Sequence, residues 1–501
     1  MSKLYIFAIG GTGSRVLKSL TMLLASGVKT RNAFDIVPII IDPHAANEDL
    51  KRTKKILSGY QNIRKKLDAN NLKENKGFFH HKITTLDELD GNLSDSFSFG
   101  LQDVTQCKFG EYLDYDTMGD SNKDLAELLF SGKSINSLGN EVSLLDVDMD
   151  IGFVGNPNIG SVVLNQFKDS EEFKVIASQF NEGDRFFIIS SIFGGTGAAG
   201  FPTIIKNLRN AIKTNLPNKQ IIADSSIGAI SVMPYFNIMP SDDSPIKRAD
   251  FIAKTKSALS YYKDNLTGQA AAINRLYYVM DDFSGTPFEN DAGNNGQKNN
   301  AHFIELVSAL SIIDFMGANN DELSTVNGKA QDPVCKEFST RSDIGKITFS
   351  DLNHITEELI SNPLASMMLF KKYLDENIDE VAGDIAWSKN NELLVDSNFL
   401  QSTFYRTHLK DFLNHFKEMI EEMSATERSF SPFNIGSDIA TLISGKEGKA
   451  GWLKRNIKFD SIDAKLNSNS RDKTYSSVED KLIALFSETM SEVLEENYKI
   501  N

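Results

Sequence analysis

The chain has 501 residues, of which 53 are basic and 68 acidic, and its formal net charge is −15. This acidic balance argues against general binding to nucleic acid, and the 41 % content of hydrophobic residues is that of a folded protein. Only two cysteines occur, which excludes a disulfide framework and a cysteine-based zinc site. No apolar run approaches the roughly 20 residues that span a bilayer. Since the N-terminus also lacks a signal-peptide pattern, we expect a cytoplasmic protein without a membrane span.

The N-terminal segment predicts a strand, a glycine turn, a helix and a second strand. Residues 4–9 form a continuous apolar run, as expected for a strand that is covered on both faces of a parallel sheet. After the glycines at 10–13, apolar residues follow helical spacing as far as Leu24. Residues 36–41 form a second apolar run, which ends at Asp42. Because Pro38 lacks an amide donor, we expect it near the start of this strand or at a bulge.

Further along, a polar stretch precedes a regular alternation of strands and helices. We interpret residues 48–148 as an insertion of short helices and loops, because their apolar signal is weak. Strands are predicted over 186–192, 227–233 and 276–280, and helices over 198–216, 246–265 and 301–316. This order predicts an α/β fold with a mostly parallel, doubly covered sheet. Beyond residue 352 the period is helical, so we expect a first domain over 1–330 and a mainly helical C-terminal domain over 331–501.

Two glycine-rich turns are predicted to connect a strand to a helix. The first is Gly-Gly-Thr-Gly-Ser at residues 10–14, and the second is Gly-Gly-Thr-Gly-Ala at residues 194–198. Glycine lets the backbone approach a ligand closely, and the amides at a helix N-terminus suit phosphate. Either turn alone could simply pack a helix tightly against a strand. Two nearly identical turns in one domain suggest that they hold one polyphosphate between them.

These turns resemble the phosphate loops of the tubulin/FtsZ superfamily of GTPases. Residues 194–198 are similar to the superfamily signature, although Phe193 replaces a small residue and Ala199 precedes the final glycine. Residues 10–14 resemble the first phosphate loop, and residues 152–160 resemble the third, which in the family senses the terminal phosphate. Residues 300–306 look like the start of the central helix that contacts the base. The resemblance covers roughly residues 1–317 and is closest to the diverged bacterial tubulin-like proteins.

The resemblance implies that GTP with Mg²⁺ binds to the loops, to strand-end acids and to the central helix. Asp42 would act on the metal through water, and Glu305 is the candidate acid for reading guanine, although a helix cap or a salt bridge is an equal alternative for it. Asp281 stands where the family has an asparagine, which puts the choice of base in doubt. The residues implied in nucleotide binding are Gly10, Gly11, Thr12, Gly13, Ser14, Asp42, Gly155, Asn156, Gly194, Gly195, Thr196, Gly197, Ala198, Asp242, Asp243, Arg248, Asp281, Phe303 and Glu305.

In this superfamily, hydrolysis uses an acidic loop that enters the nucleotide site of the next subunit. The candidates for this catalytic role are Asp321, Glu322 and Asp351, and for each of them an ordinary solvated acid is the alternative. The resemblance therefore implies self-association, with hydrolysis that is completed between subunits, or is weak or absent. Contacts with other protein subunits would fall to the insertion and the C-terminal helices.

Two other functions remain open from the sequence. Residues 10–16 resemble a dinucleotide fingerprint that lacks its third glycine, and together with Asp42 and Arg52 they look somewhat like the adenylating enzymes that activate ubiquitin-like proteins. That function predicts a catalytic cysteine and often Cys-x-x-Cys zinc ligands, and the latter are absent. It also leaves the second glycine turn without a role. The third alternative is a non-hydrolysing structural subunit of a larger assembly.

Overall fold

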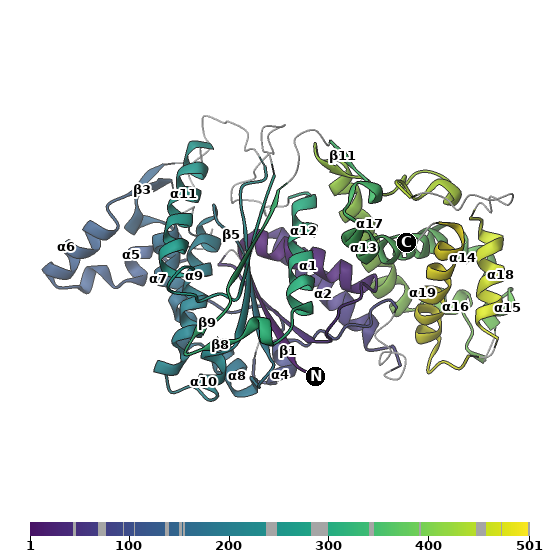
Figure 1. The fold of residues 1–501 in the computed structure, drawn as a ribbon, viewed down its shortest axis with the longest axis horizontal. Helices are drawn as coiled ribbons and strands as arrows, with labels where there is room; N and C mark the ends of the chain where they lie inside the picture. Colours follow the sequence, from purple (N-terminus) through teal and green to yellow (C-terminus); the bar gives the residue numbers. More distant parts are fainter. Residues whose placement is uncertain are drawn as a thin grey trace.

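A computed structural model of the chain describes most of its residues (Figure 1). These are residues 1–43, 47–68, 77–93, 95–104, 106–135, 140–149, 153, 156–236, 248–281, 299–339, 345–389, 392–446, 457–471 and 473–498. Of the predicted site residues, Gly155, Asp242 and Asp243 lie outside this part of the chain, and Arg248 is described only as the first residue of a helix. Within the described residues, none of the helices has the length and apolar character needed to cross a bilayer.

A six-stranded parallel sheet forms the centre of the N-terminal part, in the order β10-β7-β6-β5-β1-β2. The inner strands β1, β5 and β6 and the edge strand β2 carry long runs of buried residues, whereas β7 mixes buried and partly exposed residues. The strands are β1 (Lys3–Ile9), β2 (Asp35–Ile41), β5 (Arg185–Ser191), β6 (Ser226–Val232), β7 (Arg275–Met280) and β10 (Val334–Ser339). The structure thus confirms the predicted mostly parallel sheet.

Helices cover both faces of this sheet (Figure 1). One layer contains α1 (Gly10–Ala25), α2 (Glu48–Arg64) and α12 (Phe303–Gly317), in which α1 packs between the other two. The opposite layer contains α7 (Pro157–Leu164), α8 (Glu171–Gln179), α9 (Gly195–Arg209), α10 (Lys219–Ala223) and α11 (Arg248–Asn265). Phe201 of α9 packs on Tyr262 of α11, with ring centroids 4.9 Å apart. The sheet is therefore doubly covered, as predicted.

Pro38 lies in the middle of β2 and not at its start or at a bulge, where the sequence placed it. The reason is that β2 is an edge strand. On its outer side the amides of Ile36 and Ile40 donate to the carbonyls of Lys82 and Phe97, and the ring nitrogen of Pro38 falls between these two bonds. A residue without an N–H is tolerated there because the ladder needs no donor at that point.

Two elements differ from the predicted division of the chain. Residues 48–64, predicted as part of a polar insertion, form α2, whose Leu57 and Tyr60 are fully buried. Residues 334–339, predicted to lie in the C-terminal domain, form β10, so the sheet extends beyond residue 330. Both segments were missed because charged residues interrupt their apolar pattern. The rest of the predicted insertion holds short elements: α4 (Leu86–Leu89), α5 (Phe109–Tyr112), α6 (Asp120–Leu129), β3 (Lys133–Ile135) and β4 (Glu141–Ser143).

The C-terminal part is mainly helical, as predicted, and shares one hydrophobic core with the sheet part. Phe412 of α17 contacts Phe79, with ring centroids 5.1 Å apart, and Phe370 of α13 stacks on Phe78 at 5.5 Å. The helices are α13 (His354–Glu376), α14 (Ile378–Val381), α15 (Ala386–Lys389), α16 (Ser397–Leu400), a π-helical turn (Phe404–Lys410) that continues into α17 (Asp411–Ser424), α18 (Phe459–Asn469) and α19 (Val478–Asn497). The short strands are β8 (Thr325–Val326), β9 (Lys329–Ala330), β11 (Lys346–Ile347) and β12 (Ser429–Phe430).

Candidate functional site

The sheet has its topological switch point between β1 and β5. From β1 the chain first adds β2 on one side and later returns to add β5 on the other side. In open parallel α/β sheets, ligands bind at such a point, beyond the carboxyl ends of the two strands. The strands that flank it are the two that are followed by glycine turns, which lead into α1 and α9.

The two glycine turns lie against each other. A Cβ atom placed on Gly10 would be 3.6 Å from the Cβ of Thr196 and 3.7 Å from the amide nitrogen of Gly197. Gly10 has φ of +70°, a conformation that other residues rarely adopt. The residues that precede α1 and α9, Ile9 and Gly194, make no side-chain cap to either helix. Two helix N-termini with amides that no cap satisfies therefore meet at the switch point, an arrangement that suits an anion.

The last glycine of each turn has a packing role. A Cβ on Gly13 would lie 2.6 Å from the carbonyl carbon of Ala8, and one on Gly197 would lie 2.6 Å from the carbonyl oxygen of Ser191. Each glycine therefore lets its helix approach the preceding strand. Gly11 is different. The nearest neighbour of a Cβ placed there would be the side-chain nitrogen Nδ2 of Asn47, 3.4 Å away. The alternative of tight helix–strand packing thus accounts for one glycine of each turn.

The remaining residues of the turns differ in exposure. Thr12 is 6 % exposed, and Ser14 is fully buried under α2, where its carbonyl accepts a hydrogen bond from Thr53. The side chain of Ser14 therefore faces the protein interior, and only its backbone belongs to the turn. In the second turn the partly exposed residues are Gly194, Gly195, Thr196 and Ala198.

The start of α7 lies beside the second turn. Asn156 occupies the N-cap position of α7 without capping it through its side chain, and Pro157 is the first helical residue. A Cβ on Gly160 would lie 2.7 Å from the Cβ of Ala199, so α7 and α9 approach closely at these residues. The part of the predicted third loop that the structure describes is thus next to the second loop.

Behind the first turn, Arg15 joins four elements. Its guanidinium donates to Glu305 at 2.7 Å, to Asp49 at 3.0 Å and to the Tyr235 hydroxyl at 2.9 Å, with Thr12 Oγ1 at 3.4 Å. Burial opposes the charged form, but Tyr235, Glu305 and Asp49 hold the pKa of Arg15 well above its usual value. This buried cation fixes α1 relative to α2, α12 and the end of β6.

Glu305 is committed to this network. Its side chain is 1 % exposed, pairs with Arg15 and accepts a hydrogen bond from Tyr235 at 3.1 Å. It also accepts one from the backbone amide of His302 at 3.4 Å and so completes a capping box at the start of α12. From the sequence, a helix cap or a salt bridge was the alternative role for Glu305. Both of these contacts are present. Sequence reasoning missed Arg15 and Tyr235, because nothing in their local pattern indicates a partner 290 or 70 residues away.

Asp42 lies at the end of β2, and the side-chain amide of Asn47 reaches its carboxylate at 3.4 Å. Asn47 also caps α2 and lies next to Gly11, so Asp42 is close to the first turn. In the described part of the chain, no three His, Cys, Asp or Glu side chains gather to hold a metal ion. A single carboxylate beside a glycine turn fits Mg²⁺ only as proteins hold it together with phosphates, which with water would supply the other ligands.

The C-terminal part closes one side of the site. Asp281, at the end of β7, is paired with Arg428 at 2.6 Å, and Phe303 stacks on Phe430 with ring centroids 4.9 Å apart. Both partners lie next to or within β12. Two of the residues predicted to contact the nucleoside, Asp281 and Phe303, therefore contact a segment that the resemblance does not cover, so this contact was not predicted.

The candidate catalytic acids lie apart from each other. Asp321 and Glu322 form a short helical turn just after the C-terminal end of α12, and Glu322 pairs with Arg275 at the start of β7. Asp351 is near the opposite end of α12, because the adjacent Phe349 packs on Phe430, which stacks on Phe303. Asp351 also caps its own turn by accepting hydrogen bonds from Thr348. Of the three candidates, Asp321 and Glu322 thus lie at the amino edge of the sheet.

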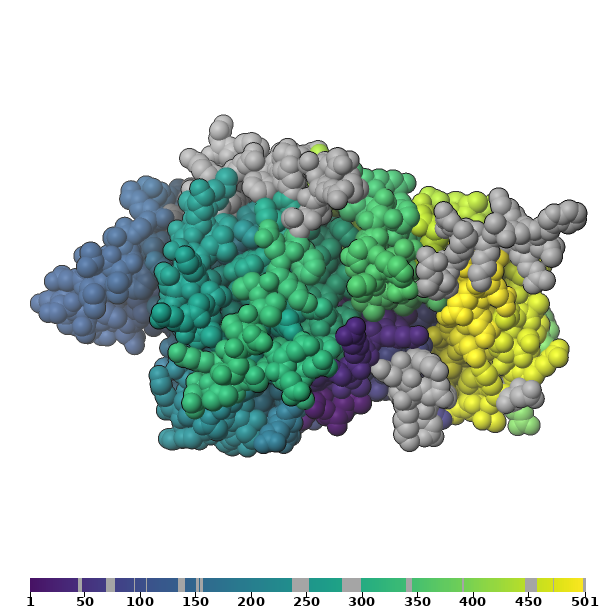
Figure 2. All heavy atoms as spheres, in the orientation of Figure 1, coloured from purple at the N-terminus to yellow at the C-terminus, as the bar shows by residue number. Residues whose placement is uncertain are grey.

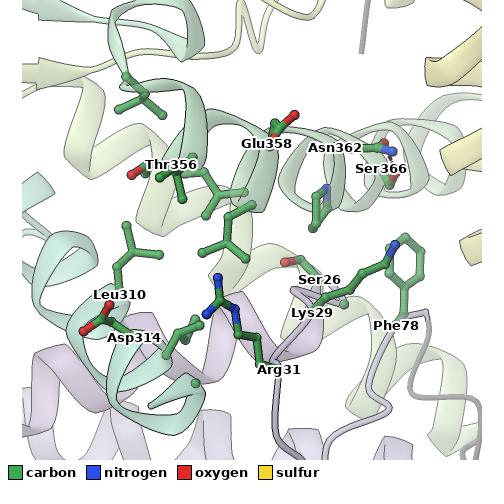
Figure 3. A pocket seen from close by; sticks show the side chains of 18 of the residues that line it. Ser26, Lys29, Arg31, Phe78, Leu310, Asp314, Thr356, Glu358, Asn362 and Ser366 are labelled. Atoms are coloured by element: carbon green, nitrogen blue, oxygen red, sulfur yellow. Dashed lines mark hydrogen bonds between the residues drawn. The ribbon is translucent and has the colours of Figure 1, made fainter. Parts of the chain in front are cut away.

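A cavity of about 1900 Å³ separates α12 from the C-terminal helices (Figure 3). Lys29, Arg31 and Asp314 lie on one wall, and Thr356 and Asn362 of α13 lie on the other. The glycine turns do not line this cavity, whereas Phe303, Glu322 and Asp351 do. It runs along the whole of α12 and is separate from the switch point.

The sheet, its two helical layers and the helical C-terminal part form the α/β fold class that the resemblance to the tubulin/FtsZ superfamily implied. As a sequence, the chain matches no known protein family and no curated protein.

Among solved structures it is similar to CetZ from Methanosaeta thermophila strain DSM 6194, at 12 % identity and a TM-score of 0.24, over 66 % of this chain and 57 % of that one. It is also similar to CetZ2 from Haloferax volcanii in a GTPγS-bound protofilament, at 11 % identity and a TM-score of 0.28, over 74 % and 72 %. The match thus spans less than two thirds of the Methanosaeta protein. TM-scores of this size do not establish a common fold. The fold class is assigned from the strand order and the helical layers.

Proposed function

We propose that the protein binds GTP with Mg²⁺ between its two glycine turns, in the manner of the tubulin/FtsZ superfamily. The observation that supports this most is the contact between Gly10 and Thr196 at the switch point, where two uncapped helix N-termini meet. A single helix start would suit one phosphate, whereas two that converge suit a chain of phosphates. Guanine rather than adenine is proposed on the resemblance alone.

The proposed roles follow from the surroundings of each residue. The amides of the two turns, around Gly11 and Gly195, bind the phosphates, with the hydroxyl of Thr196 as a further donor. Asn156 lies at the terminal phosphate, because α7 begins beside the second turn. Asp42 holds Mg²⁺ through its waters. Glu305 serves as a positioning residue, since its carboxylate holds Arg15 behind the first turn.

Hydrolysis, where it occurs, is proposed to need a second copy of the chain. α12 has 15 residues, which corresponds to about 22 Å, and it leads from the site side of the sheet to Asp321 and Glu322. These acids cannot reach a nucleotide on the same molecule, but they would face that of a copy stacked end to end. GTPase activity would then rise more steeply than linearly with protein concentration. Activity that stays linear down to dilute monomer would contradict the stacked arrangement.

The first test is to identify the nucleotide that co-purifies with the protein, and then to titrate nucleotide-free protein with fluorescent GTP and ATP analogues. Gly11→Asp is the decisive variant, because a Cβ on Gly11 would make only ordinary van der Waals contacts, with the side chains of Asn47 at 3.4 Å and Arg15 at 3.5 Å. A carboxylate in the first turn of α1 favours the helix by about 0.3–1 kcal/mol but repels a triphosphate. We expect binding to fall at least 100-fold in Gly11→Asp with no loss of thermal stability. Gly11→Asn is the matched uncharged control and should retain most of the affinity. Equal affinity in both variants would overturn the proposal.

The adenylating enzyme is the weaker candidate. Its arginine, Arg52, is 9 % exposed and paired with Glu422 at 2.9 Å and Glu418 at 3.0 Å. Burial and nearby acids raise the pKa of the Cys107 thiol, which disfavours the reactive thiolate. An adenylating enzyme would exchange pyrophosphate into ATP, so the same protein preparation distinguishes the two functions.

A further inference from the structure

The described residues of segment 101–150, here called the acidic lobe, project from the sheet on the side away from the C-terminal helices (Figures 1 and 2). Residues 101–150 contain eleven Asp or Glu and three Lys, a net charge of −8 out of −15 for the whole chain. One tenth of the sequence thus carries more than half of the net charge. α6 lies at the far end of this lobe (Figure 1).

Helix α6 exposes an apolar face. Leu125, Leu128 and Leu129 are 51 %, 73 % and 57 % exposed, and their spacing of three and four residues places them on one side of the helix. The opposite side is anchored in the lobe by Ala126 and by Phe130, whose ring lies 4.8 Å from that of Phe109. The lobe therefore holds α6 in place through two buried residues and presents three leucines to solvent.

Three adjacent exposed leucines at the end of a projecting lobe are typical of an interaction surface. Asp120, Asp124 and Glu127 belong to the same helix and place negative charge along one flank of the leucines. Pairing of two copies through this face would bring two lobes of net charge −8 together, which charge repulsion opposes. A partner with an apolar stripe and basic flanks satisfies both features at once.

We propose that α6 of the acidic lobe docks a basic amphipathic helix of a partner protein. The leucines enter the apolar stripe of that helix, and the acidic side chains around them face its Lys and Arg residues. Because the lobe is separate from the glycine turns, this proposal does not depend on nucleotide binding. The two proposals can fail independently.

The test uses the full chain and a synthetic 18-residue helical peptide with leucine at positions i, i+3, i+4 and i+7 and lysine elsewhere. Binding is measured by fluorescence anisotropy in 50 and 300 mM salt. We expect the triple variant Leu125→Ser/Leu128→Ser/Leu129→Ser to bind at least 10-fold more weakly than the unaltered chain. Binding to the unaltered chain should also weaken at the higher salt concentration.

Two controls identify the surface. Ile355→Ser removes an exposed apolar residue, 79 % exposed, from α13 in the C-terminal part and should leave binding unchanged. A peptide with glutamate in place of lysine should not bind. Absence of binding, or equal loss in Ile355→Ser and the triple variant, would overturn the proposal. So would a dimer of the unaltered chain in light scattering that the triple variant abolishes, because the occupant would then be a second copy.

Discussion

Helices of this molecule begin in two ways, with or without a side-chain cap. In the C-terminal part, α13 and α19 begin after Asn353 and Ser477, whose side chains accept hydrogen bonds from amides of the first turn. At the switch point of the sheet, α1 and α9 begin after Ile9 and Gly194 and receive no such cap. Thr12 and Thr196 are nearby, but they stand inside the first turns and not at the capping positions.

The difference shows what distinguishes a structural helix start from a candidate binding site. A side-chain cap satisfies one of the orphan amides of a helix start from within the chain itself. An uncapped start leaves those amides to water or to a ligand, and two of them face each other here. The predictions below test this contrast, from the largest expected effect to the smallest.

The largest effect is expected at the support behind the first turn. Arg15→Met removes the cation that pairs with Glu305 and Asp49 and leaves both carboxylates buried. Breaking a buried ion pair in this way costs about 3–5 kcal/mol of unfolding free energy, which urea denaturation would measure. Adding Glu305→Gln to this variant should recover part of the loss. A loss below about 1 kcal/mol for Arg15→Met would show that the network does not support α1.

The packing glycines should be sensitive even to alanine. A Cβ on Gly13 meets the backbone of Ala8 at 2.6 Å, so Gly13→Ala must shift α1 away from β1. We expect a loss of about 1–3 kcal/mol, as for other overpacked sites. Gly436→Ala is the control, because a Cβ there has no neighbour within 4 Å. Equal stability of the two variants in thermal denaturation would contradict the close approach of helix and strand.

A buried histidine just beyond the C-terminal end of α1 predicts that the stability of the fold depends on pH. His81 is 3 % exposed, and one ring nitrogen lies 2.9 Å from the carbonyl of Val28, just after α1. Burial, with His80 as a second cause, lowers the pKa of His81 from 6.5 to about 3. The neutral ring is favoured in the fold, so this stability is complete above pH 6.5 and is lost as the pH falls toward 3.

Between pH 6.5 and 5 the loss should reach about 2 kcal/mol, at 1.4 kcal/mol for each pH unit. Urea denaturation at several pH values measures it. His81→Gln should remove this contribution and make the dependence less steep between pH 6.5 and 5, while His80, His302 and His415, whose pKa values are also lowered by burial, keep theirs. An equally steep dependence in the variant would show that other groups cause it.

The smallest effect is expected at the capped helix starts. Asn353→Ala and Ser477→Ala each remove one side-chain acceptor from the first turn, at Thr356 and Asp480 respectively. Each should cost about 1 kcal/mol of unfolding free energy and leave nucleotide affinity unchanged. A change in nucleotide affinity with either variant would mean that the two classes of helix start are coupled.

The sequence predicted the sheet well because β1, β2, β5 and β6 are buried along most of their length and each contains an apolar run. It predicted the two glycine turns because each directly follows an apolar run, and this order can be recognised within a few neighbouring residues. It could not predict that Arg428 and Phe430 would meet Asp281 and Phe303, since these contacts join segments more than 100 residues apart. α2 and β10 were missed for a different reason: each carries charged residues on the side that faces solvent.

The two edge strands of the sheet, β2 and β10, differ in how readily they could pair with another chain. At β2, the neighbouring segments at Ile83 and Ser98, together with Pro38, leave few free donors for a foreign strand. At β10, the thiol of Cys335 and the ring of Phe338 are exposed on the last strand of the sheet. Misassembly during expression or ageing should therefore begin at β10, and disulfide-linked dimers through Cys335 would be its first visible product.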